Sequence, residues 1–335
     1  MRNYPPRPPT GREAAGTPPS NPPDEHLALA EAVGFYLQLH PRQLPSRFLY
    51  DTLGSALFDA ICHLPWYRIT RAELQLLERH AATIGRIFRG GGRVVELGCG
   101  NGEKLATLLT HAMVHQVHAH LIDLSEAALT RSLQALGSID EPSIRVTTQQ
   151  ATYENGLLAL PTEGAHPTLV AFLGSNIGNF DRPGAAAFLA LIRAALQPRD
   201  YLLLGVDLVK PERDLLLAYD DPLGLTAAFN KNLLLRLNTE LDADFELDSF
   251  AHCAVWNREA SRVEMHLVSL AAQDVHVAQS GLRFRLEEGE TIWTESSYKY
   301  EAGGLRELVD PAGFVQRNQW IDERARFALT LFQAI

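Results

Sequence analysis

A single stretch near residue 100 constrains the fold more than any other part of the chain. The apolar pair Val94-Val95 ends in Glu96, glycines follow at positions 98, 100 and 102, and the segment from Lys104 onward has a helical period. This order predicts a strand, a tight turn and a helix. Glycine is needed where the backbone takes a positive φ or where a ligand lies too close for a Cβ. The stretch therefore predicts a ligand site at the end of a strand in an α/β sheet.

The spacing of these glycines separates two kinds of cofactor. A dinucleotide-binding turn has the pattern G-x-G-x-x-G and places a pyrophosphate on a helix N-terminus. This chain has E-x-G-x-G-x-G instead, beginning at Glu96, and Asp123 follows in the next apolar segment. The pattern resembles motif I of the class I methyltransferases, which implies that the turn holds S-adenosylmethionine (SAM). A purely structural turn is the alternative that the glycines alone leave open.

Composition limits the classes of partner. The formal net charge of −10 argues against nucleic-acid binding, and the chain has no apolar run long enough to span a bilayer. The N-terminus lacks the apolar segment of a signal peptide. Cys62, Cys99 and Cys253 have no metal-ligand spacing and cannot form a disulfide framework. We therefore expect a cytoplasmic protein that acts on a small molecule without a metal and works as a monomer.

Apolar segments alternate with segments of helical period through the first two thirds of the chain. The predicted strands after the first one are residues 118–123, 144–149, 167–173 and 201–208. This order predicts a parallel sheet with helices on both faces and ligands at the carboxyl ends of its strands. Short strand-like runs between residues 251 and 300 predict an antiparallel insertion, and a final hairpin completes the sheet. The expected fold is therefore that of a class I SAM-dependent methyltransferase, a Rossmann-like doubly wound sheet with an inserted α+β substrate-binding domain.

These patterns divide the chain into three regions. Residues 1–24 contain eight prolines and almost no apolar side chains, which predicts a disordered tail. Residues 25–71 and 210–299 form the predicted substrate-binding domain, and residues 72–209 and 300–335 form the predicted SAM-binding domain. We expect the substrate to bind between these two domains.

The segment before the glycine turn is rich in aromatic residues. Its rings include Tyr50, Phe58 and Tyr67, and a small hydrophobic core explains them as well as a binding site does. Thr70 and Glu73 then have the spacing of a capping box, which predicts the start of a long amphipathic helix.

Short motifs spread over nearly all of the chain after the tail carry a family resemblance. They are Phe48–Asp51, Gly54–Phe58, Glu96–Gly98, Gly102–Lys104, Gly174–Ser175, Ile177–Asn179, Gly205–Lys210, Ala218–Asp221, Ala227–Asn230 and Thr294–Ser297. In this order they resemble the L-histidine Nα-methyltransferases that form hercynine on the route to ergothioneine. The resemblance implies SAM-dependent methylation of the α-amine of L-histidine, as far as the trimethylated betaine.

The resemblance also implies which residues bind SAM. Gly98, Lys104 and Asp123 match the residues that hold it, with Thr152 and Tyr153 beside the adenine. Thr152 departs from the family pattern, in which an aspartate accepts a hydrogen bond from the adenine amino group. A threonine hydroxyl accepts only a weaker, uncharged hydrogen bond. We therefore expect a lower affinity for SAM.

On the substrate side, the resemblance implies a pocket for the histidine ring and a separate grip on its α-carboxylate. The implied substrate-binding residues are Tyr67, Phe58, Gly174, Asn179, Tyr219, Met265, Glu295, Ser296 and Ser297, and Asn179 and Tyr50 are the implied catalytic residues. From spacing alone, Glu295 also fits a solvated strand, Asn179 a turn and Tyr219 a core phenol.

The chemistry suits these residue types. A carboxylate and a hydroxyl can pair with the two nitrogens of an imidazole, so Glu295 would select histidine over apolar amino acids. The neutral α-amine would attack the methyl group in line, with positioning as the main source of catalysis. Three rival functions remain open: methylation of another amino acid such as an indole amino acid, a nucleotide-binding oxidoreductase, and a non-catalytic SAM-binding module.

Overall fold

The computed structural model describes residues 25–112, 116–139, 144–161 and 166–335. The predicted tail over residues 1–24 lies outside these described residues. The chain divides into two compact units. Unit 1 consists of the chain up to Tyr67 together with Pro211–Ser297, and unit 2 consists of Arg68–Lys210 together with Tyr298–Ile335. The predicted domains end at residues 71, 209 and 299 instead. The first boundary of the structure comes earlier, after Tyr67, because the first long helix of unit 2 already begins at Ile69.

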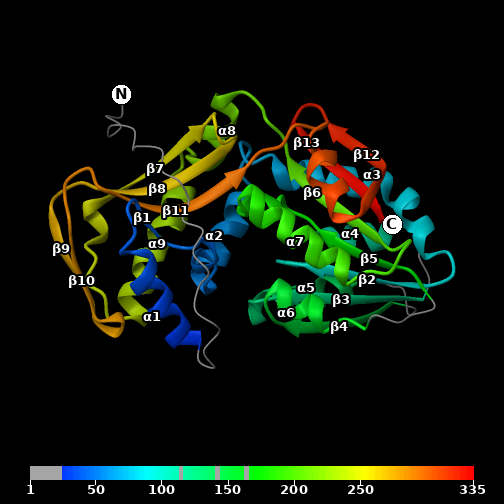
Figure 1. Cartoon of the computed structure of the whole chain (residues 1–335), viewed down its shortest axis with the longest axis horizontal. Coiled ribbons are helices and arrows are strands. Elements are labelled where there is room, and N and C mark those ends of the chain that lie inside the picture. The colour runs from blue at the N-terminus through cyan, green and yellow to red at the C-terminus, as the bar shows by residue number, and fades with distance from the viewer. Residues whose placement is uncertain (1–24, 113–115, 140–143, 162–165) are drawn as a thin grey trace. The chain divides into compact units, whose positions relative to one another are not determined.

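Unit 2 is built on a seven-stranded sheet in the order β12-β13-β6-β5-β2-β3-β4; Figure 1 labels these strands. Its strands are β2 (Gly92–Leu97), β3 (Val117–Asp123), β4 (Ile144–Gln150), β5 (Thr168–Phe172), β6 (Tyr201–Asp207), β12 (Phe314–Asp322) and β13 (Phe327–Ala334). The first five pair in parallel, whereas β13 runs antiparallel to both β6 and β12. The order turns back at β2 and β5, which is the switch point where doubly wound sheets bind ligands. The predicted class I methyltransferase sheet is therefore confirmed.

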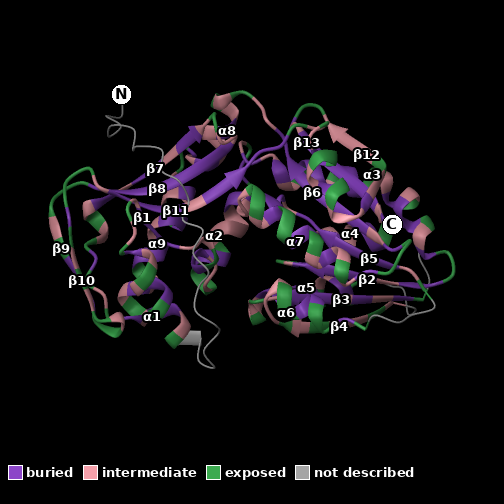
Figure 2. Cartoon of the chain, viewed as in Figure 1, coloured by how far each residue is buried: buried purple, intermediate pink, exposed green. Residues whose placement is uncertain are grey.

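Helices cover the sheet of unit 2. They are α3 (Ile69–Ile84), α4 (Glu103–Ala112), α5 (Glu126–Gly137), α6 (Tyr153–Leu158), α7 (Arg182–Ala194) and α10 (Leu305–Val309). Helices α6, α7 and α10 bury their apolar residues in one core with Val95 and Leu97 of β2. Because side chains alternate along a strand, Glu96 points to the opposite face, where α3 packs on α4. Figure 2 shows the central strands of this sheet as buried.

Unit 1 contains a four-stranded sheet in the order β1-β11-β8-β7 and a two-stranded sheet of β9 and β10. Its elements are α1 (Glu25–Tyr36), β1 (Arg42–Gln43), α2 (Thr52–Cys62), α8 (Glu212–Tyr219), α9 (Leu225–Glu240), β7 (Phe250–Asn257), β8 (Arg262–Ser269), β9 (Gln273–Val277), β10 (Leu282–Leu286) and β11 (Thr291–Tyr298), whose last residue belongs to unit 2. β7 and β8 form an antiparallel hairpin, as do β9 and β10. The N-terminal strand β1 joins the sheet parallel to β11, which the hairpin pattern did not predict. Helices α8 and α9 pack on β7 and β8.

The start of α3 differs from the predicted capping box. The helix begins at Ile69, its N-cap position is Arg68, and no side chain caps it. Glu73 instead turns inward and is completely buried. The prediction was wrong because Glu73 bonds to residues far along the chain, which outweighs the local pairing that the sequence pattern suggests. In the described part of the chain, no helix is both long enough and apolar enough to cross a membrane.

Candidate functional site

The glycine loop, residues 98–102, leaves β2 in a conformation that side chains resist. Gly98, Gly100 and Gly102 have φ values of +74°, +57° and +77°, in the left-handed region. The loop is anchored where the amide of Gly98 donates to the carbonyl of Ile122 on β3, at 2.8 Å. The glycines therefore sit where the sequence predicts them to be needed, between β2 and α4.

Space above Gly98 is restricted by two polar side chains. A Cβ at Gly98 would lie 2.6 Å from the hydroxyl oxygen of Tyr153 and 3.1 Å from Nδ2 of Asn176. At Gly102 a Cβ would lie 2.6 Å from the Cα of Ser132, so that glycine lets α4 and α5 approach each other. Gly98 thus makes room for two polar side chains beside the loop, whereas Gly102 makes room for the packing of α5.

Asp123 ends β3 beside the glycine loop. Its carboxylate accepts from the amide of Ser125 at 2.9 Å and from the amide of Gly100 at 3.3 Å. Burial raises the pKa of Asp123, and these two backbone hydrogen bonds oppose that rise. The backbone therefore fixes the direction of the carboxylate before any ligand binds.

Glu96 is a second buried acid at the same place. One of its carboxylate oxygens, Oε2, is buried without a hydrogen-bond partner in the described part of the chain. Burial raises the pKa of Glu96 to about 8; Lys104 opposes the rise, and Glu73 and Asp123 add to it. Three carboxyl groups and one lysine thus surround the loop. Near neutral pH Glu96 is protonated and Glu73 is paired with Lys104, so the Asp123 carboxylate is the charge that favours a cationic ligand such as SAM over a pyrophosphate.

Thr152 and Tyr153 follow β4. The Thr152 hydroxyl accepts from the amide of Asn155 at 3.2 Å and caps α6. The ring of Tyr153 packs against Phe172 and Phe188, and burial raises the pKa of its hydroxyl. The residue that departs from the family pattern therefore has a local structural role as an N-cap, which the sequence reasoning missed.

Lys104 and Gly174 meet through Glu73. The Lys104 ammonium lies 2.9 Å from Oε2 of Glu73, and the amide of Gly174 donates to both oxygens of the same carboxylate. Gly174 opens a turn that leads into the short helix Asn176–Asn179, at whose end the half-buried Asn179 lies. Unit 2 thus brings together two residues that the sequence assigned separately to cofactor and substrate.

In unit 1, five rings form a continuous aromatic cluster, which consists of Tyr50, Phe58, Tyr67, Tyr219 and Phe229. Tyr50 lies 5.4 Å from Phe58 and 5.5 Å from Phe229, and Tyr67 lies 6.0 Å from Phe58 and 6.4 Å from Tyr219, measured between ring centroids. Phe229 of α9 was not among the predicted site residues. Its position in a helical apolar pattern gives no sign of a cluster that draws on α2 and α8 as well.

Glu295 and Ser297 belong to the same part of unit 1. The hydroxyls of Tyr219 and Ser297 are hydrogen-bonded at 2.8 Å. The pKa of Tyr67 is well above its ordinary value, mainly because the residue is buried, and the negative charge of Glu295 contributes to the rise. The ring of Tyr67 also lies 6.4 Å from that of Tyr219, so the alcohol and the two phenols are neighbours, and Glu295 lies two residues before Ser297 on β11.

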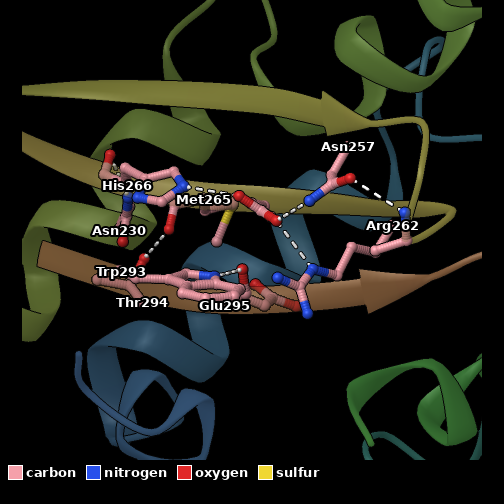
Figure 3. A network of polar contacts seen from close by, with 10 residues as sticks. Asn230, Asn257, Arg262, Met265, His266, Trp293, Thr294 and Glu295 are labelled. Atoms are coloured by element: carbon pink, nitrogen blue, oxygen red, sulfur yellow. Dashed lines mark hydrogen bonds and ion pairs between the residues drawn. The ribbon is translucent and has the colours of Figure 1, made fainter. Parts of the chain in front are cut away.

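Met265 and Ser296 are buried beside these residues. The carbonyl of Met265 accepts from the hydroxyl of Thr294 at 3.1 Å (Figure 3). The Ser296 hydroxyl is buried without a hydrogen-bond partner in the described chain. Of the predicted substrate residues, Gly174 and Asn179 belong to unit 2 and the others to unit 1.

Unit 1 also contains a group of hydrogen-bonded polar side chains, which we call the Glu264 cluster. It consists of Arg262, Glu264 and His266 of β8 and of Asn257 at the end of β7. The Glu264 carboxylate accepts from Arg262 and Asn257, each at 2.8 Å, and its Oε2 lies 3.2 Å from Nε2 of His266. Figure 3 shows Asn257, Arg262 and His266 in this network of polar contacts. Burial raises the pKa of Glu264, but these hydrogen bonds outweigh it, and the pKa lies below its ordinary value. The Arg262 guanidinium also stacks on the ring of Trp293. Sequence reasoning did not single out this cluster.

His252 connects the sheet to Tyr219. Its Nε2 lies 2.8 Å from the carbonyl of Tyr219, and its Nδ1 lies 2.9 Å from Nδ2 of Asn230. Since Asn230 donates to Nδ1, Nε2 must carry the proton that is donated to the carbonyl. Burial lowers the pKa of His252, which agrees with a neutral ring. The backbone of Tyr219 is thus fixed from the sheet side.

Known proteins are similar to this chain over nearly all of its length. The family described as "Histidine-specific methyltransferase, SAM-dependent" matches residues 29–334. The histidine N-alpha-methyltransferase of Mycolicibacterium smegmatis is 39% identical over 91% of this chain and 94% of its own length, and that of Mycobacterium tuberculosis is 37% identical over 91% and 95%. The ergothioneine biosynthesis protein 1 of Schizosaccharomyces pombe is 30% identical over 81% of this chain and 36% of its own length.

Proposed function

This chain belongs to the family of histidine-specific, SAM-dependent methyltransferases, and from that premise we propose that it methylates the α-amine of free L-histidine. The alternative of an indole amino acid is not favoured, because the matched family is histidine-specific and its two mycobacterial relatives are named for histidine. An oxidoreductase is ruled out by the same match, which names SAM as the cofactor.

The observation that carries the proposal is the grouping of an acid, an alcohol and two phenols in unit 1. Glu295 acts electrostatically on Tyr67, and Ser297 is hydrogen-bonded to Tyr219. An imidazole needs one partner for each nitrogen, and a carboxylate with a hydroxyl can supply both. A side chain without these nitrogens would not form the hydrogen bonds that the imidazole forms here, and a hydrogen bond to a charged group contributes ~1.5–3 kcal/mol. We infer that this grouping selects histidine.

The cofactor side of the proposal rests on unit 2. Gly98, Lys104, Asp123, Thr152 and Tyr153 are the residues that we propose hold SAM. When bound, SAM supplies a methyl group activated by its sulfonium charge. The Asp123 carboxylate favours a cation beside the loop, and Lys104, paired with Glu73, supplies an ammonium for the carboxylate of SAM.

The remaining roles concern the substrate amine and its carboxylate. We propose that Asn179 and Tyr219 hold the α-carboxylate, that Gly174 also contacts the substrate, and that Met265 and Ser296 line the ring pocket. The Tyr50 hydroxyl and the ring of Phe58 would lie beside the amine. Aromatic rings attract cations through their faces without requiring an N–H donor, so the cluster tolerates an amine that gains one, two and then three methyl groups. We therefore propose the trimethylated betaine as the product.

Mass spectrometry of histidine incubated with SAM and the protein tests the proposed reaction. We expect products that carry one, two and three added methyl groups, with the trimethylated form accumulating. Tryptophan in place of histidine is the matched control and should remain unmodified. Methylation of tryptophan but not histidine would contradict the proposal.

The variant Glu295→Ala tests whether Glu295 binds the imidazole. Loss of a charge-assisted hydrogen bond should raise the KM for histidine ~10–100-fold, while the KM for SAM stays within about twofold. Glu288→Ala, in the exposed turn between β10 and β11, is the control and should change neither value. An unchanged KM for histidine in Glu295→Ala would remove this residue from the pocket.

Two further expectations remain part of the proposal. We infer that the enzyme acts in the cytoplasm, since all three of its cysteines are free thiols. We also propose that it works as a monomer on a small molecule and not on nucleic acid, given its net charge of −10. Light scattering with size-exclusion chromatography gives the mass of the particle and tests the first part of that statement directly.

A further inference from the structure

Glu73 occupies a position that the assigned binding residues do not explain. Its side chain projects from α3 and is completely buried. Oε1 and Oε2 lie 2.9 and 2.8 Å from the amide nitrogen of Gly174, and Oε2 also lies 2.9 Å from Nζ of Lys104. One carboxylate therefore contacts both a proposed cofactor residue and a proposed substrate residue.

The cost of burying this charge shows that the contacts matter. An ionised carboxylate removed from water loses several kcal/mol of hydration unless charged and hydrogen-bonding partners replace it. Lys104 supplies the charge and Gly174 supplies the N–H. The Lys104 side chain is 24% exposed whereas that of Glu73 is 0% exposed, so the ammonium is the end of the pair that a ligand can reach.

Two glycines leave room for this pair. A Cβ at Gly205, in the middle of β6, would lie 1.9 Å from Oε1 of Glu73. A Cβ at Gly174, whose φ is +76°, would lie 2.8 Å from Nζ of Lys104. Glycine in a central strand weakens the strand unless another group needs the space. Gly205 is thus explained by the approach of the Glu73 carboxylate.

The bond to Gly174 fixes the turn before Asn179. Gly174 and Ser175 both have positive φ, an uncommon pair that needs outside support. Glu73 holds the first residue through its amide, and the Ser175 hydroxyl holds the second by accepting from the amide of Asp207 at 2.9 Å. The short helix that ends in Asn179 follows directly.

We propose that Glu73 is a positioning residue for the methyl transfer, which orients Lys104 for the cofactor and fixes the turn that carries Asn179. The inference deepens the proposed function, since it assumes the same cofactor and substrate sites. Glu73 contacts neither reacting atom. It acts through the lysine on one side and through the backbone of Gly174 on the other, so one buried charge sets the geometry of both.

The variant Glu73→Gln separates the two contacts. Glutamine keeps an acceptor for the Gly174 amide but removes the charge that orients Lys104. We expect the dissociation constant for SAM, measured by calorimetry, to rise ~10-fold or more and kcat to fall by a similar factor. Glu78→Gln makes the same change at an exposed position of α3 and should leave both values unchanged. A Glu73→Gln protein with normal SAM affinity and kcat, and only a lower unfolding temperature, would overturn the proposal.

A double variant keeps the test decisive if Glu73→Gln does not fold. Lys104→Met with Glu73→Gln leaves neither charge buried alone, so it should fold. If Glu73 acts on SAM through Lys104, the double variant binds SAM as weakly as Lys104→Met does. A further loss in the double variant would show an independent effect and contradict the proposal.

Direct SAM binding distinguishes this inference from the proposed function. Failure of the wild-type protein to methylate histidine would refute the proposed function, while the calorimetric comparison of Glu73→Gln with wild type would still test the role of Glu73. Gly205→Ala provides an independent perturbation, because its methyl group displaces the Glu73 carboxylate without changing any charge. It should weaken SAM binding in the same direction as Glu73→Gln.

Discussion

The glycine loop of unit 2 and the Glu264 cluster of unit 1 are both buried and charged, yet they are built in different ways. The loop takes its form from the backbone, through three glycines with positive φ and a carboxylate held by amides. The Glu264 cluster lies on regular strand, and its form comes from hydrogen bonds between side chains that meet at one carboxylate. A backbone with positive φ requires glycine, which can be recognised in the sequence, whereas a network of hydrogen bonds between side chains has almost no recognisable sequence pattern.

The largest effect should come from breaking the Glu264 cluster. Glu264→Ala leaves the Arg262 guanidinium buried without its carboxylate, which costs ~3–5 kcal/mol of unfolding free energy. Glu287→Ala removes one of the two acidic partners of the exposed Arg285 and should cost far less, because water screens an exposed ion pair. Urea denaturation of both variants measures the difference. Equal losses would mean that the buried cluster contributes no more than a surface ion pair.

Next in size is the effect of a methyl group at two glycines of the loop. Gly98→Ala places a Cβ 2.6 Å from the Tyr153 hydroxyl, whereas the Cβ of Gly100→Ala would meet nothing within 4 Å. Both variants are strained by an alanine at positive φ, but only Gly98→Ala must also displace the Tyr153 hydroxyl. We expect SAM affinity to fall ~100-fold in Gly98→Ala and less than ~10-fold in Gly100→Ala. Calorimetry that ranks them the other way would contradict the assigned role of Gly98.

A smaller and pH-dependent effect should come from Glu96. An unfolded glutamate loses its proton near pH 4.5, but the buried carboxyl of Glu96 has a pKa of about 8. Between these values the folded protein holds the extra proton, so its stability falls as the pH rises, by up to ~1.4 kcal/mol per pH unit. Glu96→Gln should remove this part of the slope. Parallel stability curves for the two ligand-free proteins between pH 5 and 8 would contradict the burial argument.

The smallest effect should come from Thr152. Aspartate caps helices as well as threonine does, and it offers a charged acceptor. Thr152→Asp should therefore keep α6 intact and tighten SAM binding by less than ~10-fold. Thr152→Ala should lose ~1 kcal/mol of stability, because the amide of Asn155 loses its acceptor. If Thr152→Asp weakens binding, the position does not face the adenine amino group.

The same contrast explains what the sequence could predict. The alternation of strands and helices, the glycine turn and Asp123 follow from local patterns, and the structure has them where expected. Glu73 was assigned to a helix cap because its true partner, Gly174, lies 101 residues away. Arg262, Glu264 and His266 alternate with Val263, Met265 and Leu267, a pattern typical of a strand with one face in water. All eight residues of β8 are buried, and only the assembled network explains this.

The position of β13 has a consequence for how the chain is made. It pairs with β6 in a register that joins Asp207 to Phe327, so the ribosome must complete all of the inserted hairpins before β6, which already has β5 on one side, meets β13 on the other. Throughout that interval one edge of the apolar strand β6 has unpaired backbone N–H and C=O groups, and such an edge can pair with other chains and aggregate. Yield in the cell should therefore depend on chaperone supply and on the pace of translation between these two strands.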